Sequence, residues 1–366
     1  MSKKRHKDTI QRSSGEKFTF IDLFAGIGGF HIAMSRIGGK CVFASEWDKY
    51  AQETYRANFP NTPLYGDITL DETKSHIPDG FDVLCAGFPC QAFSNAGLKK
   101  GFEDTRGTLF HEIATILRDK KPKVAFLENV RGLISHDKGK TLQIILQTIT
   151  EIGYSCNIPQ EIIWGDSPRK LQDEAKKMVL LAREFGLCQN RQRIYIILWR
   201  NDLNIDKFIY PQPTYAPTKV SDILDPTVDS KYTISDRMWL GHQTRKKRNE
   251  EKGKGFGYSL FSPDDPYTST ISARYWKDGS EILIDQSDKG LNPRTLTPVE
   301  AGRLQGYRIL GNGWERIECA NNQNYNDSNP EFKIVVSKKE AYHQFGNSVA
   351  IPVIKRIAEE IVKQLM

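Results

Sequence analysis

The first half of the chain alternates short apolar runs with stretches of helical spacing, and this alternation restricts the folds open to it. Buried strands are predicted at 18–24 (FTFIDLF), 41–46 (CVFASE), 81–86 (FDVLCA), 124–129 (VAFLEN) and 194–199 (IYIILW). The intervening stretches place apolar residues at helical spacing, at 32–37, 49–59, 108–120 and 141–152. The pattern predicts an α/β fold with a parallel, doubly wound sheet, which binds ligands beyond the carboxyl ends of its strands.

A glycine-rich turn, DLFAGIGGF, follows the first predicted strand. Glycines there let the backbone approach a ligand and adopt positive φ. His31 stands where a dinucleotide fingerprint has glycine or alanine, which disfavours NAD. Glu46 can instead accept from ribose hydroxyls, Trp47 can face an adenine ring, and Asp67 can accept from an adenine amine. We expect a nucleoside without a pyrophosphate. The alternatives are a plain tight turn, surface packing for Trp47 and a helix cap for Asp67.

A second unusual loop, GFPCQAFSNAG, follows the third predicted strand and contains Cys90 directly after Pro89. Proline fixes its own φ and restricts the preceding residue, so the thiol has a defined direction. We favour a nucleophile over a buried bystander. The other cysteines are scattered without a C-x-x-C pair, which predicts reduced thiols and neither a disulfide framework nor a metal site: Cys41, Cys85, Cys156, Cys188 and Cys319.

Two further segments carry charged residues at predicted strand ends. Glu128 in ENVRGL can act as an acid or bond to a heterocycle edge, although it can also simply cap the next helix. Arg191 and Arg193 in QNRQRIYII lie two residues apart and so share one face of an extended segment. Paired arginines suit phosphate or carbonyl recognition, with a solvated charge pair as the alternative.

Composition sets broad limits. The 366 residues include 52 basic and 45 acidic side chains, giving a net charge of +7 that is compatible with a polyanionic partner but not diagnostic of one. The N-terminal tail is basic and lacks an apolar segment, and no apolar run approaches the roughly 20 residues that span a bilayer. We therefore expect a soluble, cytoplasmic protein without membrane contact.

The second half differs in character. Residues 210–227 are proline-rich and predict a linker, which is followed by a basic, glycine-punctuated stretch and the aromatic segment TISARYWKDGSEILI. At the end, IPVIKRIAEEIVKQL places Ile351, Ile354, Ile357, Ile361 and Leu365 on one helical stripe that should return the chain to the first domain. We expect a basic tail at 1–17, a catalytic and cofactor-binding domain at 18–200 plus 341–366, and a smaller domain at 201–340.

Seven motifs, in order, resemble those of the DNA cytosine-5 methyltransferases, especially the bacterial restriction-modification type. They cover the chain from about residue 18 to its end: DLFAGIGGF, GFPCQAFSNAG, DTRGTLF, FLENVRGL, QNRQRIYI, RTLTPVEAGRLQGY and QFGNSVAIPV. The resemblance implies a Rossmann-like methyltransferase domain, with a small target-recognition domain at 201–340.

The resemblance also implies catalytic roles. Cys90 would add to carbon 6 of cytosine, so that carbon 5 can accept a methyl group. Glu128 would bind ring nitrogen 3 and the exocyclic amine, Arg193 the carbonyl oxygen of the base, and Arg191 would support the loop or contact a phosphate. The target base must leave the duplex stack. Residues 91–107 resemble the family's mobile loop that closes over the flipped base.

The implied cofactor is S-adenosyl-L-methionine. Residues expected to line its site, by this resemblance, are Phe24, Ala25, Gly26, Gly28, Gly29, Glu46, Trp47, Asp67, Ile68, Pro89, Leu109, Asn347 and Val349.

The implied partner is double-stranded DNA. Guanine presents paired acceptors in the major groove that arginine or lysine can bind. Arg274 and Lys277 are the candidates for base contact, with bracing of the small domain as the alternative. Phosphate contacts are expected from Arg245, Lys246, Lys247 and Arg248. By resemblance the target is CCNGG or CCWGG, modified by a monomer that protects DNA from a restriction endonuclease and needs no protein partner.

Three rival functions remain. One is a tRNA cytosine-5 methyltransferase, one a non-catalytic DNA-binding module of the same fold, and one an amino-group methyltransferase. Comparison with the family pattern also shows departures: Cys188 stands where proline is common and Val299 where arginine is frequent. The segments 165–186 and 312–333 are longer than usual, and we assign them no function.

Overall fold

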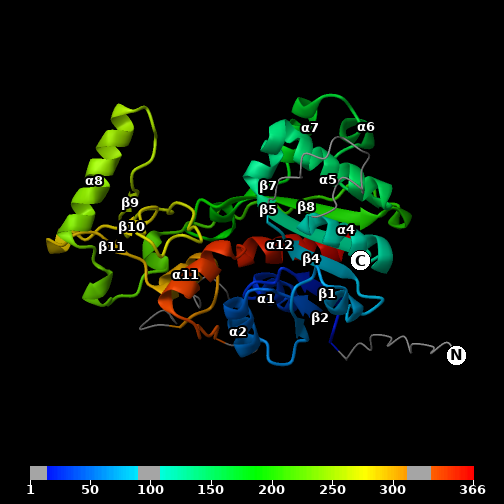
Figure 1. Cartoon of the computed structure of the whole chain (residues 1–366), viewed down its shortest axis with the longest axis horizontal. Helices are drawn as coiled ribbons and strands as arrows, with labels where there is room; N and C mark the ends of the chain where they lie inside the picture. Colours follow the sequence, from blue (N-terminus) through cyan, green and yellow to red (C-terminus); the bar gives the residue numbers. More distant parts are fainter. Residues whose placement is uncertain (1–14, 90–107, 311–330) are drawn as a thin grey trace. The chain divides into compact units, whose positions relative to one another are not determined.

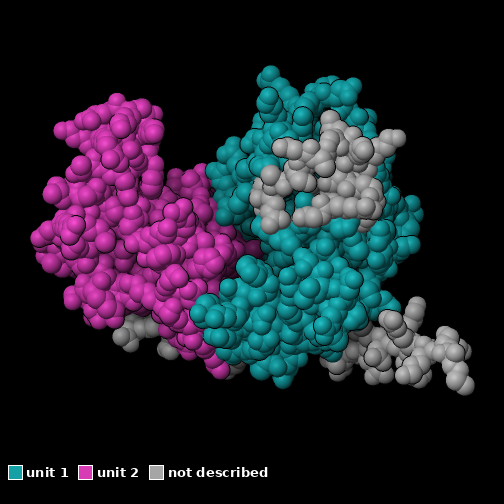
Figure 2. Space-filling model, viewed as in Figure 1, with its two compact units in different colours: residues 1–180, 192–212, 353–366 teal, residues 181–191, 213–352 magenta. Residues whose placement is uncertain are grey.

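The computed structural model describes residues 15–89, 108–310 and 331–366. Three regions lie outside these ranges. They are Cys90 with the expected loop at 91–107, most of the basic tail, and most of the 312–333 segment. The chain divides into two compact units (Figure 2). Unit 1 comprises 1–180, 192–212 and 353–366, and unit 2 comprises 181–191 and 213–352.

Unit 1 is built on an eight-stranded sheet ordered β3-β2-β1-β4-β5-β8-β6, with β7 also paired to β8 (Figure 1). Its strands are β1 (Phe18–Leu23), β2 (Gly39–Ser45), β3 (Leu64–Tyr65), β4 (Val83–Gly87), β5 (Val124–Val130), β6 (Tyr154–Ser155), β7 (Val179–Leu181) and β8 (Gln192–Arg200). The five predicted strands are all present, and the α/β, doubly wound class is confirmed.

One expectation about the sheet is wrong. The strands β3, β2, β1, β4 and β5 are mutually parallel, but β8 pairs antiparallel with both β5 and β6. After β6, which runs parallel to β5, the chain passes through α6, α7 and β7 and enters β8 from the carboxyl edge. It therefore inserts between β5 and β6 in the opposite direction.

The predicted helical stretches fold as α1 (Gly29–Ser35), α2 (Lys49–Asn58), α4 (Leu109–Lys120) and α5 (Lys140–Glu151). Alternation along β5 assigns its side chains to two faces. Ala125 and Leu127 join a core cluster with residues of α4 and α5, whereas the Phe126 ring meets Phe30 of α1 edge-on at 5.1 Å. Both faces of the sheet are thus covered, as the apolar strand sequences require.

The remaining elements of unit 1 are short. They comprise α3 (Asp71–Ser75), η2 (Arg131–Ile134), η3 (His136–Gly139), α6 (Gln160–Ile163), α7 (Pro168–Lys176) and η5 (Asn201–Leu203). The longer-than-usual 165–186 segment supplies α7, which packs on α5, η2 and η3. In this position α7 supports the segment that follows β5. It contributes none of the expected site residues.

The predicted C-terminal helix is α12 (Ile351–Leu365), and its apolar stripe is buried: Ile351, Ile354, Ile357, Ile361 and Leu365. Gln364 near its end exchanges two hydrogen bonds with the backbone of Ile209, at 2.8 and 2.9 Å. Residues 353–366 thereby belong to unit 1 although they are last in sequence.

Unit 2 has little regular structure. It contains α8 (Asp236–Glu251), α9 (Pro298–Leu304), α11 (Lys338–Asn347) and a small sheet of β9 (Leu260–Phe261), β10 (Leu283–Ile284) and β11 (Arg294–Thr295). Buried charges tie it together, since the Arg294 guanidinium binds both oxygens of Glu300 at 2.8 Å. Removing one partner of such a buried pair typically costs about 3–5 kcal/mol.

The unit boundaries differ from the expected domain limits. The linker at 210–227 does contain a boundary, at residues 212 and 213, but 181–191 and 341–352 pack with unit 2. Within the described residues, no helix has the length and apolar composition needed to cross a bilayer.

Candidate active site

The glycine-rich turn connects β1 to α1. Two of its glycines, Gly26 and Gly28, have positive φ but differ in the space around the position of a Cβ atom. Gly28 has φ of 87°, and a Cβ there would lie 2.2 Å from the Phe59 ring, so packing excludes a side chain. Gly26 has φ of 55°, yet a Cβ there would meet nothing within 4 Å. The backbone at Gly26 therefore faces open space, as a backbone that a ligand approaches closely would.

Glu46 closes this turn from the end of β2. Its Oε2 accepts from the Gly26 N–H and its Oε1 from the Asp48 N–H, each at 2.8 Å. The residue is buried, and burial raises the pKa of its carboxyl group, while the two backbone donors act in the opposite direction. Each carboxylate oxygen has a second acceptor position, so Glu46 is fixed in place and can still bind two hydroxyl groups.

The neighbouring expected residues line the same carboxyl edge of the sheet. Trp47 follows Glu46 and is 74% exposed. Asp67 follows β3 and accepts from the Thr69 N–H at 2.9 Å through Oδ1, which is a local turn contact, and Ile68 is buried. Phe24 has φ of 54°, a left-handed conformation that is rare for a bulky residue. Ala25 bonds through its N–H to Ser45 O, which joins the turn to β2.

The other expected site of unit 1 lies where β4 and β5 end. Gly87, the last residue of β4, pairs with Glu128 of β5, so Glu128 is adjacent to the segment that leads through Pro89 to Cys90. Glu128 is buried, and its Oε1 lies 3.1 Å from Arg193 Nε without forming a hydrogen bond. Leu109 begins α4, just after its capping residue Thr108.

Arg193 comes to Glu128 because β8 is antiparallel to β5, where Val130 pairs with Arg193. Its Nη1 also donates to the Gln192 carbonyl at 2.8 Å. A buried carboxylate with one oxygen lacking a hydrogen bond among the described residues, beside a guanidinium, is suited to a polar heterocycle. The structure thus brings together Glu128, Arg193 and the lead-in to Cys90.

Arg191 has a different environment from Arg193. It is buried in unit 2, where Nη1 and Nη2 donate to the carbonyls of Gly346 and Ser348 at 3.3 and 2.5 Å. These two hydrogen bonds agree with the expectation that Arg191 supports a loop. A side chain as buried as this one is poorly placed for the alternative, a contact with a phosphate. The loop it supports holds the expected cofactor residues Asn347, which is exposed, and Val349, which is buried.

The recognition candidates of unit 2 lie on a tight turn. Tyr275 is buried and bonds through its hydroxyl to Ile282 O and Leu296 N, whereas its neighbours Arg274, Trp276 and Lys277 are exposed. The turn rests on α11 at Gly346, where a Cβ would lie 2.3 Å from the Ala273 nitrogen. The side chains expected to contact bases therefore project from a firmly anchored backbone.

The basic run belongs to α8, a helix that the sequence analysis did not anticipate. Lys246, Lys247 and Arg248 are exposed. Arg245 is not available for a phosphate: it donates to Asp278 Oδ2 at 2.9 Å and to Gly257 O at 2.9 and 3.2 Å, and contacts His242. We correct this expectation, because the guanidinium holds α8 to the adjacent loop.

Several supporting residues were not predicted from the sequence. Asn129 donates through Nδ2 to Phe88 O at 2.8 Å and so fixes the residue before Pro89. Gln189 is fully buried and bonds to Leu304 O and the Ile271 N–H, which joins three segments of unit 2. The signal for Asn129 was its place beside Glu128 at a strand end. Gln189 gave no local signal, since its partners are distant in sequence.

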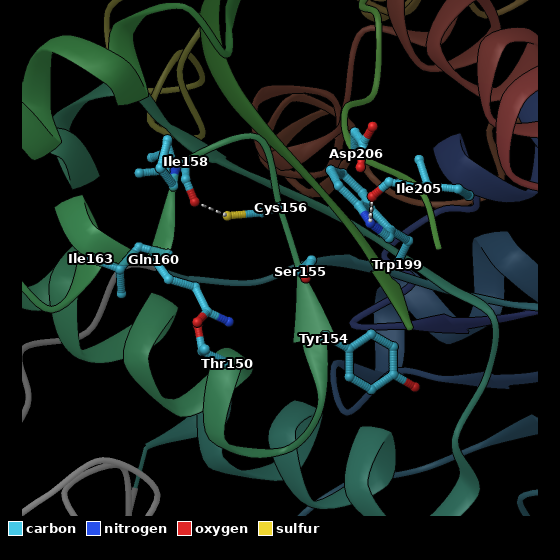
Figure 3. Close-up of a pocket in the computed structure, with 11 residues that line it drawn as sticks. Thr150, Tyr154, Ser155, Cys156, Ile158, Gln160, Ile163, Trp199, Ile205 and Asp206 are labelled. Carbon is cyan, nitrogen blue, oxygen red and sulfur yellow. Dashed lines mark hydrogen bonds between the residues drawn. The ribbon is translucent and has the colours of Figure 1, made fainter. Parts of the chain in front are cut away.

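A pocket of about 280 Å³ lies at the opposite end of the sheet (Figure 3). It includes Trp199, which pairs with Val124 at the start of β5, and Cys156, whose Sγ bonds to Ile158 O. Burial raises the pKa of Cys156 to about 11. This pocket contains none of the expected site residues.

The described cysteines are free thiols, as expected: Cys41, Cys85, Cys156 and Cys188. Burial raises the pKa of each, to about 12 for Cys188. A nucleophilic cysteine needs a thiolate, so none of these four is placed for that role.

The doubly wound α/β fold of unit 1 is that of a Rossmann-like methyltransferase. The solved structure of a Spodoptera frugiperda DNMT2 mutant has the same fold, with a TM-score of 0.66 at 18% identity, covering 94% of this chain and 99% of that one. A family model described as C-5 cytosine-specific DNA methylase matches residues 18–308 and 315–363. The chain belongs to this family.

Curated relatives are similar over nearly the whole chain. The Type II methyltransferase M.SsoII of Shigella sonnei is 47% identical over 352 residues, which cover 95% of this chain and 81% of the relative. M.NlaX of Neisseria lactamica is 49% identical over 346 residues, covering 94% and 96%. The protein is a DNA cytosine-5 methyltransferase, and its methyl donor is S-adenosyl-L-methionine.

The turn provides a test of how this donor is held. In Gly26→Ala a side chain would enter the open space at a φ that disfavours alanine, and the bond to Glu46 would be disturbed. A hydrogen bond to a charged group contributes about 1.5–3 kcal/mol, so we expect the KM for S-adenosylmethionine to rise about tenfold or more. Steady-state methyl transfer measures this.

The matched control is Gly80→Ala, because Gly80 also has positive φ, 83°, with open space around its Cβ position. Both variants should lose similar stability in thermal unfolding, but Gly80→Ala should keep the wild-type KM. An unchanged KM in folded Gly26→Ala would contradict the assignment of this turn.

Proposed function

We propose that this enzyme methylates one cytosine in CCNGG or CCWGG sites of duplex DNA, with Cys90 as nucleophile and Glu128 and Arg193 on the base. The observation that carries the residue roles is the position of Glu128. It pairs with the last residue of β4, three residues before Cys90, and its buried Oε1 lacks a hydrogen bond among the described residues.

The chemistry requires a nucleophile because carbon 5 of cytosine is itself weakly nucleophilic. A free thiol has a pKa of about 8.5, so the site must favour the thiolate or remove its proton as attack proceeds. The Cys90 thiolate adds to carbon 6, and the displaced electron pair enters the ring. A proton that the Glu128 carboxyl group shares with nitrogen 3, and the Arg193 guanidinium at the carbonyl oxygen, offset that charge, while Glu128 also accepts from the amine.

S-adenosylmethionine would supply an electrophilic methyl group to carbon 5 and leave as S-adenosylhomocysteine. The residues of the glycine-rich turn would hold it. Glu46 would bind both ribose hydroxyls and Trp47 would cover the adenine. Phe24, Gly26 and Asp67 would contact the rest of the nucleoside and the methionine part. A base then removes the carbon 5 proton and the thiolate leaves.

Unit 2 is the proposed target-recognition unit. Arg274 and Lys277 project from the anchored turn and are assigned to guanines, where a good bidentate contact discriminates by about 1–3 kcal/mol. Lys246, Lys247 and Arg248 of α8 are assigned to phosphates, which position the duplex without reading sequence. Arg245 is left out, since its guanidinium is engaged within the unit.

The wider setting follows from the target. A palindrome can be modified by a monomer, which treats each strand in turn. We propose a monomeric, cytoplasmic enzyme that protects DNA from a restriction endonuclease, as the Type II names of the relatives suggest. The target cytosine must leave the stack, at a cost of a few kcal/mol.

Bisulfite sequencing of a plasmid from cells that express the protein tests the target. We expect conversion-resistant cytosines at CCNGG or CCWGG, at the inner position of each strand, and full conversion elsewhere. Resistance confined to CG dinucleotides or GGCC would refute the target while leaving the chemistry intact. Purified enzyme that methylates tRNA in preference to duplex DNA would refute the DNA assignment itself.

A further inference from the structure

One exposed indole of unit 2 lies between two lysines from separate parts of the chain. Lys277 Nζ is 5.5 Å and Lys339 Nζ is 5.1 Å from the centre of the Trp276 ring, and the tryptophan is 40% exposed. These distances are typical of cation–π contacts. The ring thus holds two ammonium groups at fixed places on the surface, next to the turn that carries Arg274.

The arrangement continues along α11. Lys338 Nζ lies 4.1 Å from the centre of the Tyr232 ring and 5.7 Å from that of Tyr342, and Lys231 Nζ lies 5.5 Å from Tyr232. We call the set Lys231, Tyr232, Lys338, Lys339, Trp276 and Lys277 the lysine–aromatic ladder. The set contains two groups, in which Lys231 and Lys338 lie over Tyr232 and Lys277 and Lys339 lie over Trp276.

The ladder has more positive than negative charge. Among the described residues, two of its four lysines contact a carboxylate, Lys231 with Asp229 at 3.1 Å and Lys339 with Glu340 at 3.4 Å. Their side chains remain largely exposed, at 63% and 59%. Burial lowers the pKa of Lys338, and the charge of the nearby Lys231 lowers it further. A polyanion would relieve the repulsion between these two lysines.

Bracing of unit 2 alone does not require this surface. The core beneath it is already held by Tyr275, whose hydroxyl bridges Ile282 and Leu296, and by the buried pair of Arg294 and Glu300. Exposed lysines over the exposed Trp276 ring and the half-buried Tyr232 ring add little to such a core, because surface charge contacts contribute about 0–1 kcal/mol. Clustered lysines are instead the usual electrostatic feature of a surface that binds nucleic acid.

We propose that the lysine–aromatic ladder binds the phosphates of duplex DNA flanking the target, and that Trp276 positions Lys339 for this contact. The inference rests on the proposed function of unit 2 as the DNA-recognising unit. It adds a sequence-independent contact surface on α11 and the 231–232 segment, beside the residues assigned to bases. Lys277 marks the border between base contact and phosphate contact.

The test is the salt dependence of binding. Each phosphate contact contributes about 0.9 to the slope of log Kd against log salt concentration for duplex DNA. For Lys231→Gln/Lys339→Gln we expect the slope to fall by about 1–2 and the affinity to fall equally for duplexes with and without the target. Fluorescence anisotropy on a labelled duplex measures both the slope and the affinity.

The matched control removes the same charge elsewhere. Lys176→Gln/Lys177→Gln changes two exposed lysines at the carboxyl end of α7, which pair with Asp173 and Glu174, and should leave the slope nearly unchanged. Trp276→Ala should reproduce the slope loss of Lys339→Gln, whereas Trp276→Phe, which keeps a ring, should lose less. Thermal unfolding checks that each variant is folded.

Three results would overturn the proposal. The first is an unchanged salt dependence of log Kd in the folded Lys231→Gln/Lys339→Gln variant. The second is a loss of affinity confined to the duplex that contains the target. The third is tighter binding of tRNA than of duplex DNA that depends on the ladder lysines. Failure of the proposed function has a different signature, because wild-type enzyme would then leave CCNGG and CCWGG unmethylated in the bisulfite experiment whatever the binding slopes.

Discussion

Cys90→Ala should form no covalent adduct with duplex DNA carrying 5-fluorocytosine at the target, whereas the wild-type enzyme should be trapped when the methyl donor is present. Fluorine at carbon 5 cannot leave as a proton does, so the wild-type reaction stops at the stage where Cys90 is bonded to carbon 6. Without the thiol there is no bond to trap. Methyl transfer should fall by about 10⁴-fold or more, the scale of losing a catalytic nucleophile.

The control is Cys156→Ala, which removes a partly exposed thiol at the opposite end of the sheet. It should form the adduct at the wild-type rate, as measured by denaturing gel electrophoresis of labelled DNA. Cys90→Ala should also bind target DNA within a few-fold of wild type, because the thiol acts only in the chemical step. An adduct formed by folded Cys90→Ala would show that another residue is the nucleophile.

The elements of unit 1 could be predicted from sequence because their signals are local. Apolar runs such as FDVLCA and VAFLEN gave β4 and β5, and helical spacing gave α1, α2, α4, α5 and α12. The direction of β8 could not be predicted in this way. The direction depends on the position of β8 between β5 and β6 in the sheet. The residues of β8 carry no local signal for that position.

Unit 2 was less predictable for a related physical reason. Its strands have two residues each, and α8 buries only His242 among its 16 residues, so it has almost no apolar stripe to detect. What holds the unit is long-range polar contact. Gln189 bonds to residues more than 80 positions away, and Arg303 bonds to Asp225 across 78 positions.

The candidate site contains some residues with a local sequence signal and others whose role depends on contacts with distant parts of the chain. Glu46, Glu128 and Asp67 stand at strand ends, where a carboxylate in an otherwise apolar context is visible in the sequence. The difference between Arg191 and Arg193 is not visible, although they are two residues apart. Arg193 lies in β8 beside Glu128, whereas Arg191 is buried in unit 2 against Gly346 and Ser348. Likewise, the basic run gave no sign that Arg245 pairs with Asp278.

Glu128→Gln tests whether the carboxyl group acts in the transition state. The variant keeps the size of the side chain and its position opposite Gly87, but a carboxamide cannot share a proton with ring nitrogen 3 as charge enters the ring. An interaction that strengthens with developing charge affects kcat more than binding. We expect kcat to fall by about 10²–10³-fold, similar to loss of an oxyanion-type contact.

The affinity for target DNA, measured by anisotropy, should change by only a few-fold in Glu128→Gln, and trapping by 5-fluorocytosine should slow in proportion to kcat. Glu112→Gln is the matched control, because Glu112 is also a partly buried carboxylate paired with a cation, Lys74 at 2.8 Å, but lies on α4. It should keep the wild-type kcat. Equal losses of rate and affinity in Glu128→Gln would instead mean that Glu128 serves to hold the strand end, because a purely structural defect weakens the bound ground state and the transition state alike.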